Sequence, residues 1–415
     1  MRIHLRTFGC RANHYDSEAM RAMLVAAGHH LVDSAGDADV ALFNSCAVTS
    51  AVEAELRKSV RAAAKRNPRL RSIVTGCAAS LDARRGDRPI AGLPSVSDVI
   101  PGADVPAVAA ALGVPAATAL ATTHQSTARA VLRVQDGCDE HCTFCVTTVA
   151  RGANRSRSLD ALVAEAKALA QHHEEIVITG IHIGSYGSDA GSSLGALMER
   201  LIDRVPRVRF RLSSIEATEV DDRLLALFAA GDRLAPHVHA PLQSGSARVL
   251  RRMGRHWYTP ATYARVVERL AASLPCLGLG ADVIAGFPGE TDSEYRETIA
   301  LVRSLPFTYL HVFPFSSRAE APAAALPEHL GAEVVSARAA ELRSLGEAQA
   351  AAHRRRRIGT RADVIVVSGA APREGVTEDY LTVTVADPSI PRGTRFRARL
   401  REGQTPWVLS AEVAP

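Results

Sequence analysis

Short apolar segments alternate with amphipathic ones over roughly the first quarter of the chain. Residues 3–5, 40–43 and 71–75 are apolar stretches of strand length, whereas residues 17–27 and 53–65 repeat their apolar positions with a helical period. Strands and helices in alternation are typical of a parallel sheet with helices packed on its faces. The pattern therefore predicts an α/β fold for the start of the chain.

The same alternation continues on a longer scale in the middle of the chain. The predicted strands there are residues 131–134, 175–179, 207–212, 238–241, 277–283 and 309–314, and the predicted helices are 158–172, 194–204, 221–230 and 291–305. Six such strands predict an open or partial (β/α) barrel, followed by an Ala-rich helical segment over residues 322–352.

The pattern changes again near the end of the chain. Short strands are predicted at residues 362–367, 381–385, 395–400 and 407–413, which is typical of a small β-barrel. We therefore expect an α/β protein of three domains with one linker. Their boundaries are 1–113 for the parallel-sheet domain, 114–128 for an Ala- and Thr-rich linker, 129–352 for the partial barrel and 356–415 for the β-barrel.

Composition excludes two classes of protein. The 415 residues are 47% hydrophobic and 22% charged, which is typical of a globular chain. No apolar run reaches the roughly 18 residues of a membrane span, and the first residues lack a signal-peptide core, so we expect a cytoplasmic monomer. The net charge of +5 is modest. Nucleic-acid binding would therefore depend on local basic patches, for which residues 61–71, 248–255 and 354–357 are candidates.

The seven cysteines are the main chemical signal. An odd number without a secretion signal argues against a disulfide framework. Cys138, Cys142 and Cys145 have the spacing C-x3-C-x2-C within one predicted loop. Three thiolates can occupy three corners of an iron–sulfur cubane and leave one iron open. The alternative is a structural zinc ion with His141 as its fourth ligand.

Cys10, Cys46 and Cys77 are far apart in the sequence, but each follows a predicted strand. The carboxyl ends of parallel strands lie at one edge of a sheet, where ligands collect. We therefore expect these three cysteines to meet there. The alternative is that they are three buried apolar thiols.

The cysteine loop lies within a longer pattern that resembles the radical S-adenosylmethionine (SAM) methylthiotransferase family. The resemblance is carried by residues 7–13, 44–49, 75–77, 135–138, 151–157, 243–246 and 282–291, and more weakly by residues 375–380 in a TRAM-like tail. It implies two [4Fe–4S] clusters, one held by each set of three cysteines, and SAM as the cofactor. In that family SAM chelates the open iron of the Cys138 cluster and is cleaved to a radical that abstracts hydrogen. The second cluster carries the sulfur that is inserted.

The resemblance also suggests which residues face SAM. Phe144, between two cluster ligands, would exclude water, or simply pack in the core. Gly180, after a predicted strand, would let the backbone approach the cofactor. Glu216 would pair with the ammonium group of SAM, or be an exposed loop carboxylate. Gln243 and Ser244 would bind the carboxylate or ribose of SAM, or cap a turn.

The substrate is suggested by residues 178–187, 213–217 and 310–316, which resemble the branch acting on N6-threonylcarbamoyladenosine. The expected reaction is C2 methylthiolation of that nucleoside beside the anticodon, with the tRNA anticodon arm as partner and a flavodoxin- or ferredoxin-like electron donor. The arginines of residues 151–157 would neutralise the substrate carboxylate. Alternatives are isopentenyladenosine in tRNA, a ribosomal-protein aspartate, or a non-enzymatic RNA-binding protein with structural metal.

Overall fold

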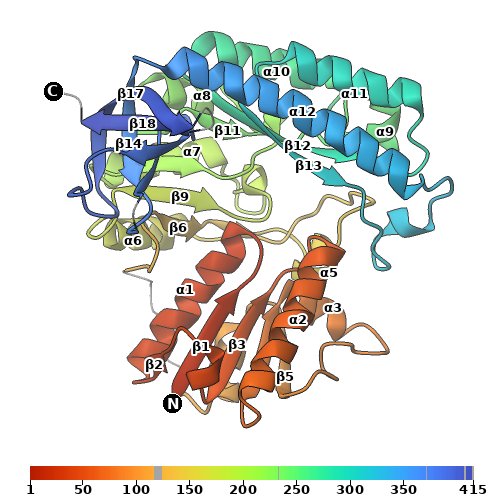
Figure 1. The fold of residues 1–415 in the computed structure, drawn as a ribbon, viewed down its shortest axis with the longest axis vertical. Helices are drawn as coiled ribbons and strands as arrows, with labels where there is room; N and C mark the ends of the chain where they lie inside the picture. The colour runs from red at the N-terminus through yellow and green to blue at the C-terminus, as the bar shows by residue number, and fades with distance from the viewer. Residues whose placement is uncertain (116–123, 232, 371, 406–407, 414–415) are drawn as a thin grey trace. The chain divides into compact units, whose positions relative to one another are not determined.

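The computed structural model describes residues 1–115, 124–231, 233–370, 372–405 and 408–413 (Figure 1). It divides into two compact units. The first comprises the described residues of 1–123, 135–155 and 316–324, and the second comprises those of 124–134, 156–315 and 325–415. Among the described residues, no helix is long and apolar enough to cross a membrane. The predicted linker falls mostly on residues 116–123, which lie outside the described residues, and the predicted domain boundaries stay predictions.

The first unit is built on a five-stranded parallel sheet in the order β2–β1–β3–β4–β5. The strands are β1 (Arg2–Thr7), β2 (His30–Leu31), β3 (Val40–Ser45), β4 (Arg71–Gly76) and β5 (Val96–Pro101). The helices are α1 (Arg11–Ala26), α2 (Ser50–Arg66), α3 (Cys77–Asp82), α4 (Val105–Ala111) and α5 (Thr147–Arg151), with a 3-10 turn η1 (Ala35–Asp37). Chain order reverses between β1 and β3, so the carboxyl ends of these two strands flank a switch point of the kind where ligands bind.

Two apolar cores cover the two faces of this sheet. One core joins α1 and α4 to the sheet through residues such as Met20, Leu24 and Val108. The other joins α2 and α3, and it also includes Val146 and Ala150 from α5. The loop that carries Cys138, Cys142 and Cys145 therefore packs with the N-terminal sheet, which the sequence pattern did not predict.

The second unit contains six parallel strands in two three-stranded sheets, β6–β9–β10 and β11–β12–β13, linked by the isolated bridges Phe210↔Leu234 and Ser214↔His239. The strands are β6 (Ala130–Arg133), β9 (Glu175–Thr179), β10 (Arg209–Leu212), β11 (His237–His239), β12 (Gly278–Ala285) and β13 (Tyr309–Pro314). The helices are α6 (Leu159–Leu169), α7 (Leu194–Arg204), α8 (Asp222–Ala229), α9 (Ala247–Arg252), α10 (Pro260–Ser273), α11 (Asp292–Ser304) and α12 (Ala332–Arg357). This arrangement confirms the predicted partial (β/α) barrel.

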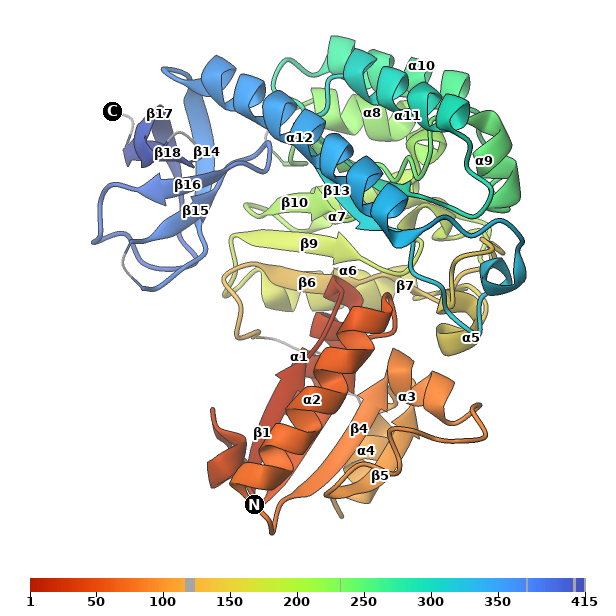
Figure 2. The same ribbon diagram turned by 45° about the vertical axis from the view of Figure 1, so that its right-hand side comes forward.

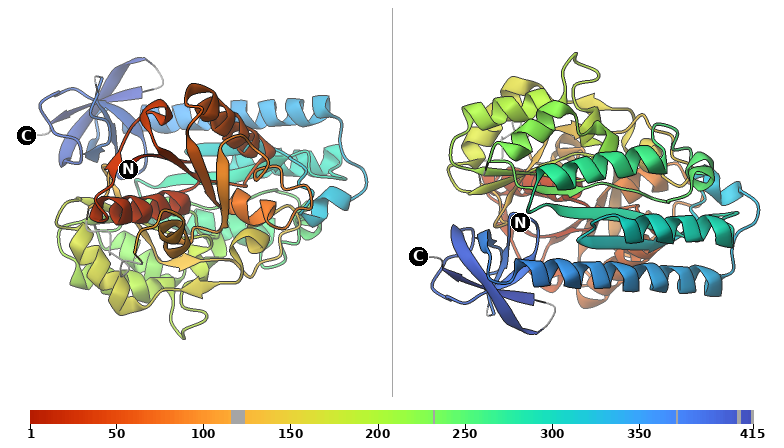
Figure 3. Two further views of the ribbon diagram at one scale, coloured as in Figure 1. Left: turned by 90° about the horizontal axis from the view of Figure 1, so that it is seen from below. Right: turned by 90° about the horizontal axis from the view of Figure 1, so that it is seen from above.

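A closed five-stranded barrel follows α12 within the same unit (Figure 2). Its strands are β14 (Arg361–Val366), β15 (Glu374–Val376), β16 (Thr382–Val385), β17 (Arg395–Thr405) and β18 (Val408–Val413). The last predicted strand began at Trp407, which lies outside the described residues. In the right-hand view of Figure 3, α12 (blue) runs beside α11 (teal). Helix α12 also packs against β13.

Several predicted elements differ from the structure. Helix α1 begins at Arg11, whereas the apolar pattern predicted a start at residue 17. The pattern missed the first turns because they bury two polar side chains, Asn13 and Asp16, which interrupt the apolar period. Strand β5 and helices α4 and α10 were not predicted. The segment predicted as helix from residue 322 starts with a short 3-10 turn, η4 (Pro322–Ala325), and α12 itself begins at Ala332.

Candidate functional site

Cys10, Cys46 and Cys77 all lie at the carboxyl edge of the first sheet. Cys10 directly precedes α1 in the loop after β1, Cys46 follows β3 directly, and Cys77 is the first residue of α3 after β4. A Cβ added to Gly9 would lie 2.4 Å from the Cys46 sulfur, so the backbone after β1 and this thiol are in direct contact. The strand-end prediction thus placed these cysteines correctly at one edge.

Two asparagines fix the loops that carry Cys10 and Cys46. The Asn13 amide donates to the carbonyl oxygens of Phe8 and Ser45, each at 2.8 Å. The Asn44 amide donates to the Asn13 carbonyl oxygen, also at 2.8 Å. These buried bonds cross between α1 and β3, so the two cysteine loops keep one relative position.

The three thiols share one electrostatic environment. Burial raises the pKa of the Cys46 thiol to about 11, and the neighbouring Cys10 and Cys77 add to the rise. Burial also raises the pKa of the Cys77 thiol, although the Arg151 guanidinium opposes the shift. Metal ligation requires thiolates, so binding of a metal cluster here must release protons from these sulfur atoms.

The second set of cysteines lies on the loop between β7 (Gln135–Asp136) and α5. The backbone N–H of Cys138 donates to the Gly152 carbonyl at 3.0 Å, and that of Cys145 donates to the Cys142 carbonyl at 3.0 Å. Gly137 has φ of +75°, and a Cβ there would lie 1.9 Å from the carbonyl oxygen of Ala153. Only glycine fits this turn, which brings Cys138 against the end of the loop.

Arg151 connects the two cysteine-bearing regions within the first unit. Its Nε donates to the Cys77 sulfur at 3.2 Å, and its terminal nitrogens contact Asp16 at 2.9 Å and Asp136 at 3.0 Å. The same guanidinium donates to the Asn13 side-chain oxygen. The Arg151 side chain is only 4% exposed. It is therefore committed to these contacts and is not available for the substrate carboxylate that sequence analysis assigned to this arginine-rich loop.

The donor set fits iron–sulfur clusters better than single zinc ions. Each set supplies three free cysteines, the number that a [4Fe–4S] cluster with one open iron takes from the protein. A closed structural zinc site takes four protein ligands. His141, the proposed fourth zinc ligand, is exposed.

The residues predicted to face SAM lie in different surroundings. Phe144 is half-buried, and Gly180 follows β9 and is also half-buried. Glu216 is only 9% exposed and forms an ion pair with Arg255, so it is not the exposed loop carboxylate of the alternative interpretation. Burial raises the pKa of Glu216, and Arg255 opposes the rise.

Gln243 and Ser244 lie after β11 in a tight turn. Gln243 has φ of +60°, and its backbone N–H and carbonyl bond to Asp282 and Ile284 of β12. The Ser244 hydroxyl is fully buried, 3.2 Å from the Thr298 hydroxyl, and accepts the Ser246 N–H. These are contacts that the turn-capping alternative predicts. Contacts of both residues with SAM stay a prediction.

Arginines on the C-terminal barrel were not singled out by sequence reasoning. Arg397, Arg399 and Arg401 are exposed on β17, with buried Ala398 and Leu400 between them. The pattern that could have identified them is the strict alternation of arginine with apolar residues in this strand, which places the arginines on one face. By contrast, Arg357 in the predicted patch 354–357 is buried and pairs with Glu378 and Asp379.

Comparison with known proteins gives matches over nearly the whole chain. Residues 2–90 match the model described as uncharacterized protein family UPF0004, and residues 132–302 match the radical SAM superfamily. The chain is 34% identical to the threonylcarbamoyladenosine tRNA methylthiotransferase MtaB of Rickettsia prowazekii, over 99% of this chain and 98% of that protein. It is 36% identical to the protein of the same name from Thermotoga maritima, over 77% and 76% of the two chains.

Two further similarities extend the comparison. The chain is 34% identical to the tRNA-2-methylthio-N(6)-dimethylallyladenosine synthase of Sorangium cellulosum, over 88% of this chain and 81% of that protein. Among solved structures, the radical SAM methyltransferase TsrM from Kitasatospora setae matches with a TM-score of 0.56 at 14% identity, over 78% and 75% of the chains. At this identity the structural match bears on the fold alone.

Proposed function

Because this chain belongs to the radical SAM tRNA methylthiotransferase family, whose cofactors are SAM and two [4Fe–4S] clusters, we propose that it converts N6-threonylcarbamoyladenosine in tRNA to its 2-methylthio derivative. The proposal rests mainly on one observation, that two separate sets of three cysteines belong to the same compact unit. Each set leaves one iron without a protein ligand. Full-length similarity to relatives named for this nucleoside supports the substrate.

We assign one cluster to Cys138, Cys142 and Cys145 and the other to Cys10, Cys46 and Cys77. When bound, SAM and the first cluster supply a radical that removes hydrogen from an unactivated carbon. The chain orients these groups through the tight turn at Gly137 and excludes water with the half-buried Phe144. Gly180, Glu216, Gln243 and Ser244 remain the candidates for contacting SAM.

The proposed partner is the anticodon arm of a tRNA. The exposed arginines of β17 supply positive charge that suits RNA phosphates. Bases in a loop are accessible to such an enzyme because they are not paired in a helix. We further propose that the protein acts as a cytoplasmic monomer and receives electrons from a flavodoxin- or ferredoxin-like protein, since the clusters of this reaction require a low-potential donor.

Isopentenyladenosine in tRNA is the second candidate substrate, because the Sorangium relative named for dimethylallyladenosine is equally identical over most of its length. The two nucleosides differ in chemistry at N6, where one is anionic and the other apolar. They can therefore be separated directly by offering both to the same enzyme preparation.

The test is anaerobic reconstitution of the full chain, followed by reaction with SAM, reductant and matched anticodon stem-loops bearing either nucleoside. Mass spectrometry of the digested RNA should show methylthiolation of the threonylcarbamoyl substrate. A C138A/C142A/C145A variant should give no product and hold about four irons, against about eight in the wild type. Product from the isopentenyl RNA alone, or from a ribosomal-protein aspartate, would contradict the proposed substrate.

A further inference from the structure

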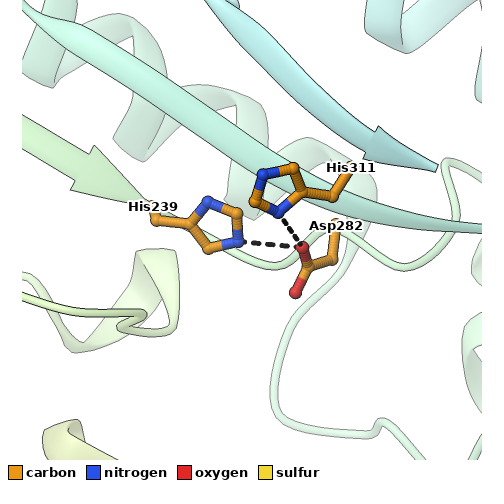
Figure 4. A group of neighbouring side chains, drawn as sticks. All are labelled: His239, Asp282 and His311. Carbon is orange, nitrogen blue, oxygen red and sulfur yellow. Dashed lines mark hydrogen bonds and ion pairs between the residues drawn. The ribbon is translucent and has the colours of Figure 1, made fainter. Parts of the chain in front are cut away.

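A cluster of polar side chains lies on one face of the β11–β12–β13 sheet, within the second unit. Figure 4 shows the imidazoles of His239 and His311 pointing at the same carboxylate oxygen of Asp282. The distances to that oxygen are 2.9 Å from His239 Nε2 and 3.2 Å from His311 Nδ1. Side chains alternate along a strand, and Leu310 packs against Gly346 of α12, so His311 points to the sheet face opposite that helix.

Asp282 is an anion that orients both rings. Burial alone would raise the pKa of Asp282, but hydrogen bonds and charge from the two histidines outweigh it and lower the pKa. A carboxylate only accepts hydrogen bonds, so each histidine donates an N–H to it. His311 therefore holds its proton on Nδ1 toward Asp282, and its Nε2 is directed away from the carboxylate.

The two other histidines of the cluster are buried and lie within hydrogen-bond distance of the same hydroxyl group. His239 is 6% exposed, and its Nδ1 lies 3.0 Å from the Tyr309 hydroxyl. His237 is 1% exposed and lies 2.8 Å from the same hydroxyl. The His311 side chain differs, because it is 55% exposed and its Nε2 has no hydrogen-bond partner in the described part of the chain. His311 is therefore the most exposed of the three histidines.

Two of the three arginines in residues 151–157 are committed to other partners, and the third, Arg155, is 59% exposed and lies 3.7 Å from Asp136. Arg151 is buried among its partners in the first unit. Arg157 pairs with Glu165 at 2.6 Å and also donates to the Arg133 carbonyl. A polar N6 substituent still needs a hydrogen-bonding partner, because an unpaired carboxylate or hydroxyl loses its hydration at a cost on binding.

We infer that His311, oriented by Asp282, is a specificity-determining residue that hydrogen-bonds the threonylcarbamoyl group of the substrate through Nε2. This inference rests on the proposed function. With the Nδ1 proton directed at Asp282, Nε2 of the neutral imidazole accepts a hydrogen bond from the hydroxyl of that group. In the imidazolium form Nε2–H donates to its carboxylate. An apolar isopentenyl group would leave the same nitrogen unpaired, so the residue discriminates against it.

The test compares wild type with His311→Leu and His311→Gln, the latter keeping a side-chain amide that can both accept and donate a hydrogen bond. Equilibrium binding to anticodon stem-loops with and without the threonylcarbamoyl group gives a readout independent of turnover. The wild type should prefer the modified loop, His311→Leu should lose about ten-fold or more of that preference, and His311→Gln should recover part of it. KM for the modified RNA should rise more than kcat falls. His256→Leu, an exposed histidine in the same unit, is the matched control.

Other outcomes would overturn the inference without touching the proposed function. If the wild type methylthiolates the threonylcarbamoyl RNA but His311→Leu keeps the full binding preference, His311 does not recognise that group. One equivalent of zinc, or of iron in excess of sulfide, that disappears in His311→Leu would make His239, Asp282 and His311 a metal site instead. Failure of the wild type on this RNA would contradict the proposed function itself.

Discussion

Arg151 joins a buried acid to a cysteine sulfur through a single guanidinium. Asp16 is 2% exposed and lies 2.9 Å from one terminal nitrogen, while Nε contacts Cys77. A planar group with donors on several sides can satisfy all of these partners at once, which a lysine cannot do. The cysteines were evident from their spacing, but the partners of Arg151 were not, because Asp16 lies 135 residues earlier in the chain.

Replacement of Arg151 by methionine should strongly destabilise the first unit. The change keeps most of the side-chain volume but removes the Arg151 charge that pairs with the buried Asp16 carboxylate, and breaking a buried ion pair costs about 3–5 kcal/mol. Urea denaturation of the wild type and of Arg151→Met measures the loss, and Arg151→Lys should fall between them. Equal midpoints for all three proteins would show that the buried pair contributes no stability.

Among the elements of the first sheet, the turn from β4 into α3 requires a glycine. Gly76 ends β4 with φ of +94°, immediately before Cys77 begins α3. A Cβ at this position would lie 2.4 Å from the Ser45 carbonyl oxygen and 2.6 Å from the Asn44 side-chain oxygen. The sequence alone indicates the strand and the Gly-Cys pair. The close approach of β3 depends on its pairing with β4, which places Ser45 opposite Gly76.

Gly76→Ala should therefore displace Cys77 and empty one cluster site. We expect reconstituted protein to hold about four irons in place of about eight, with the cluster of the 138–145 loop retained. Gly28→Ala is the matched control, because Gly28 also has a positive φ of +76° but no atom within 4 Å of the added carbon. It should lose about 1–3 kcal/mol of stability through backbone strain and keep its iron. Equal iron content in both variants would rule out the steric argument.

At the scale of the whole molecule, a buried ion network joins the C-terminal barrel to the six-stranded barrel within the second unit. Glu175 on β9 accepts from Arg209 at 2.6 Å and from Arg211 at 2.9 Å. The same arginines donate to carbonyl oxygens of Asp363, Thr377 and Glu378 in the C-terminal barrel. The two barrels therefore share buried charges and should unfold together.

This network predicts a specific pH dependence. Burial would raise the pKa of Glu175, but Arg209 and Arg211 outweigh it and hold the pKa well below its ordinary value. A depressed folded-state pKa means that the stabilisation is complete above the unfolded value of about 4.3 and is lost as the pH falls further. Glu175→Gln should cost about 3–5 kcal/mol at neutral pH, because the buried Arg211 loses its carboxylate partner and Arg209 keeps only Asp363.

Urea denaturation between pH 8 and pH 3 checks this prediction. The difference in unfolding free energy between wild type and Glu175→Gln should be constant down to about pH 5 and should shrink below about pH 4.3. Glu199→Gln, an exposed glutamate of α7, is the control and should show little difference at any pH. A difference that grows on acidification would contradict the assigned direction of the pKa shift.

The sequence by itself determined the two sets of cysteines, the parallel-strand architecture and the family, because these depend on spacing and periodicity along the chain. It predicted helix α1 too short, because Asn13 and Asp16 serve the cysteine region and interrupt the apolar period. Only the tertiary structure decided which charges meet. The pairing of Arg151 with Asp16, and of His239 and His311 with Asp282, depends on the register of neighbouring strands and on packing between elements far apart in sequence. Local propensity carries no information about such contacts.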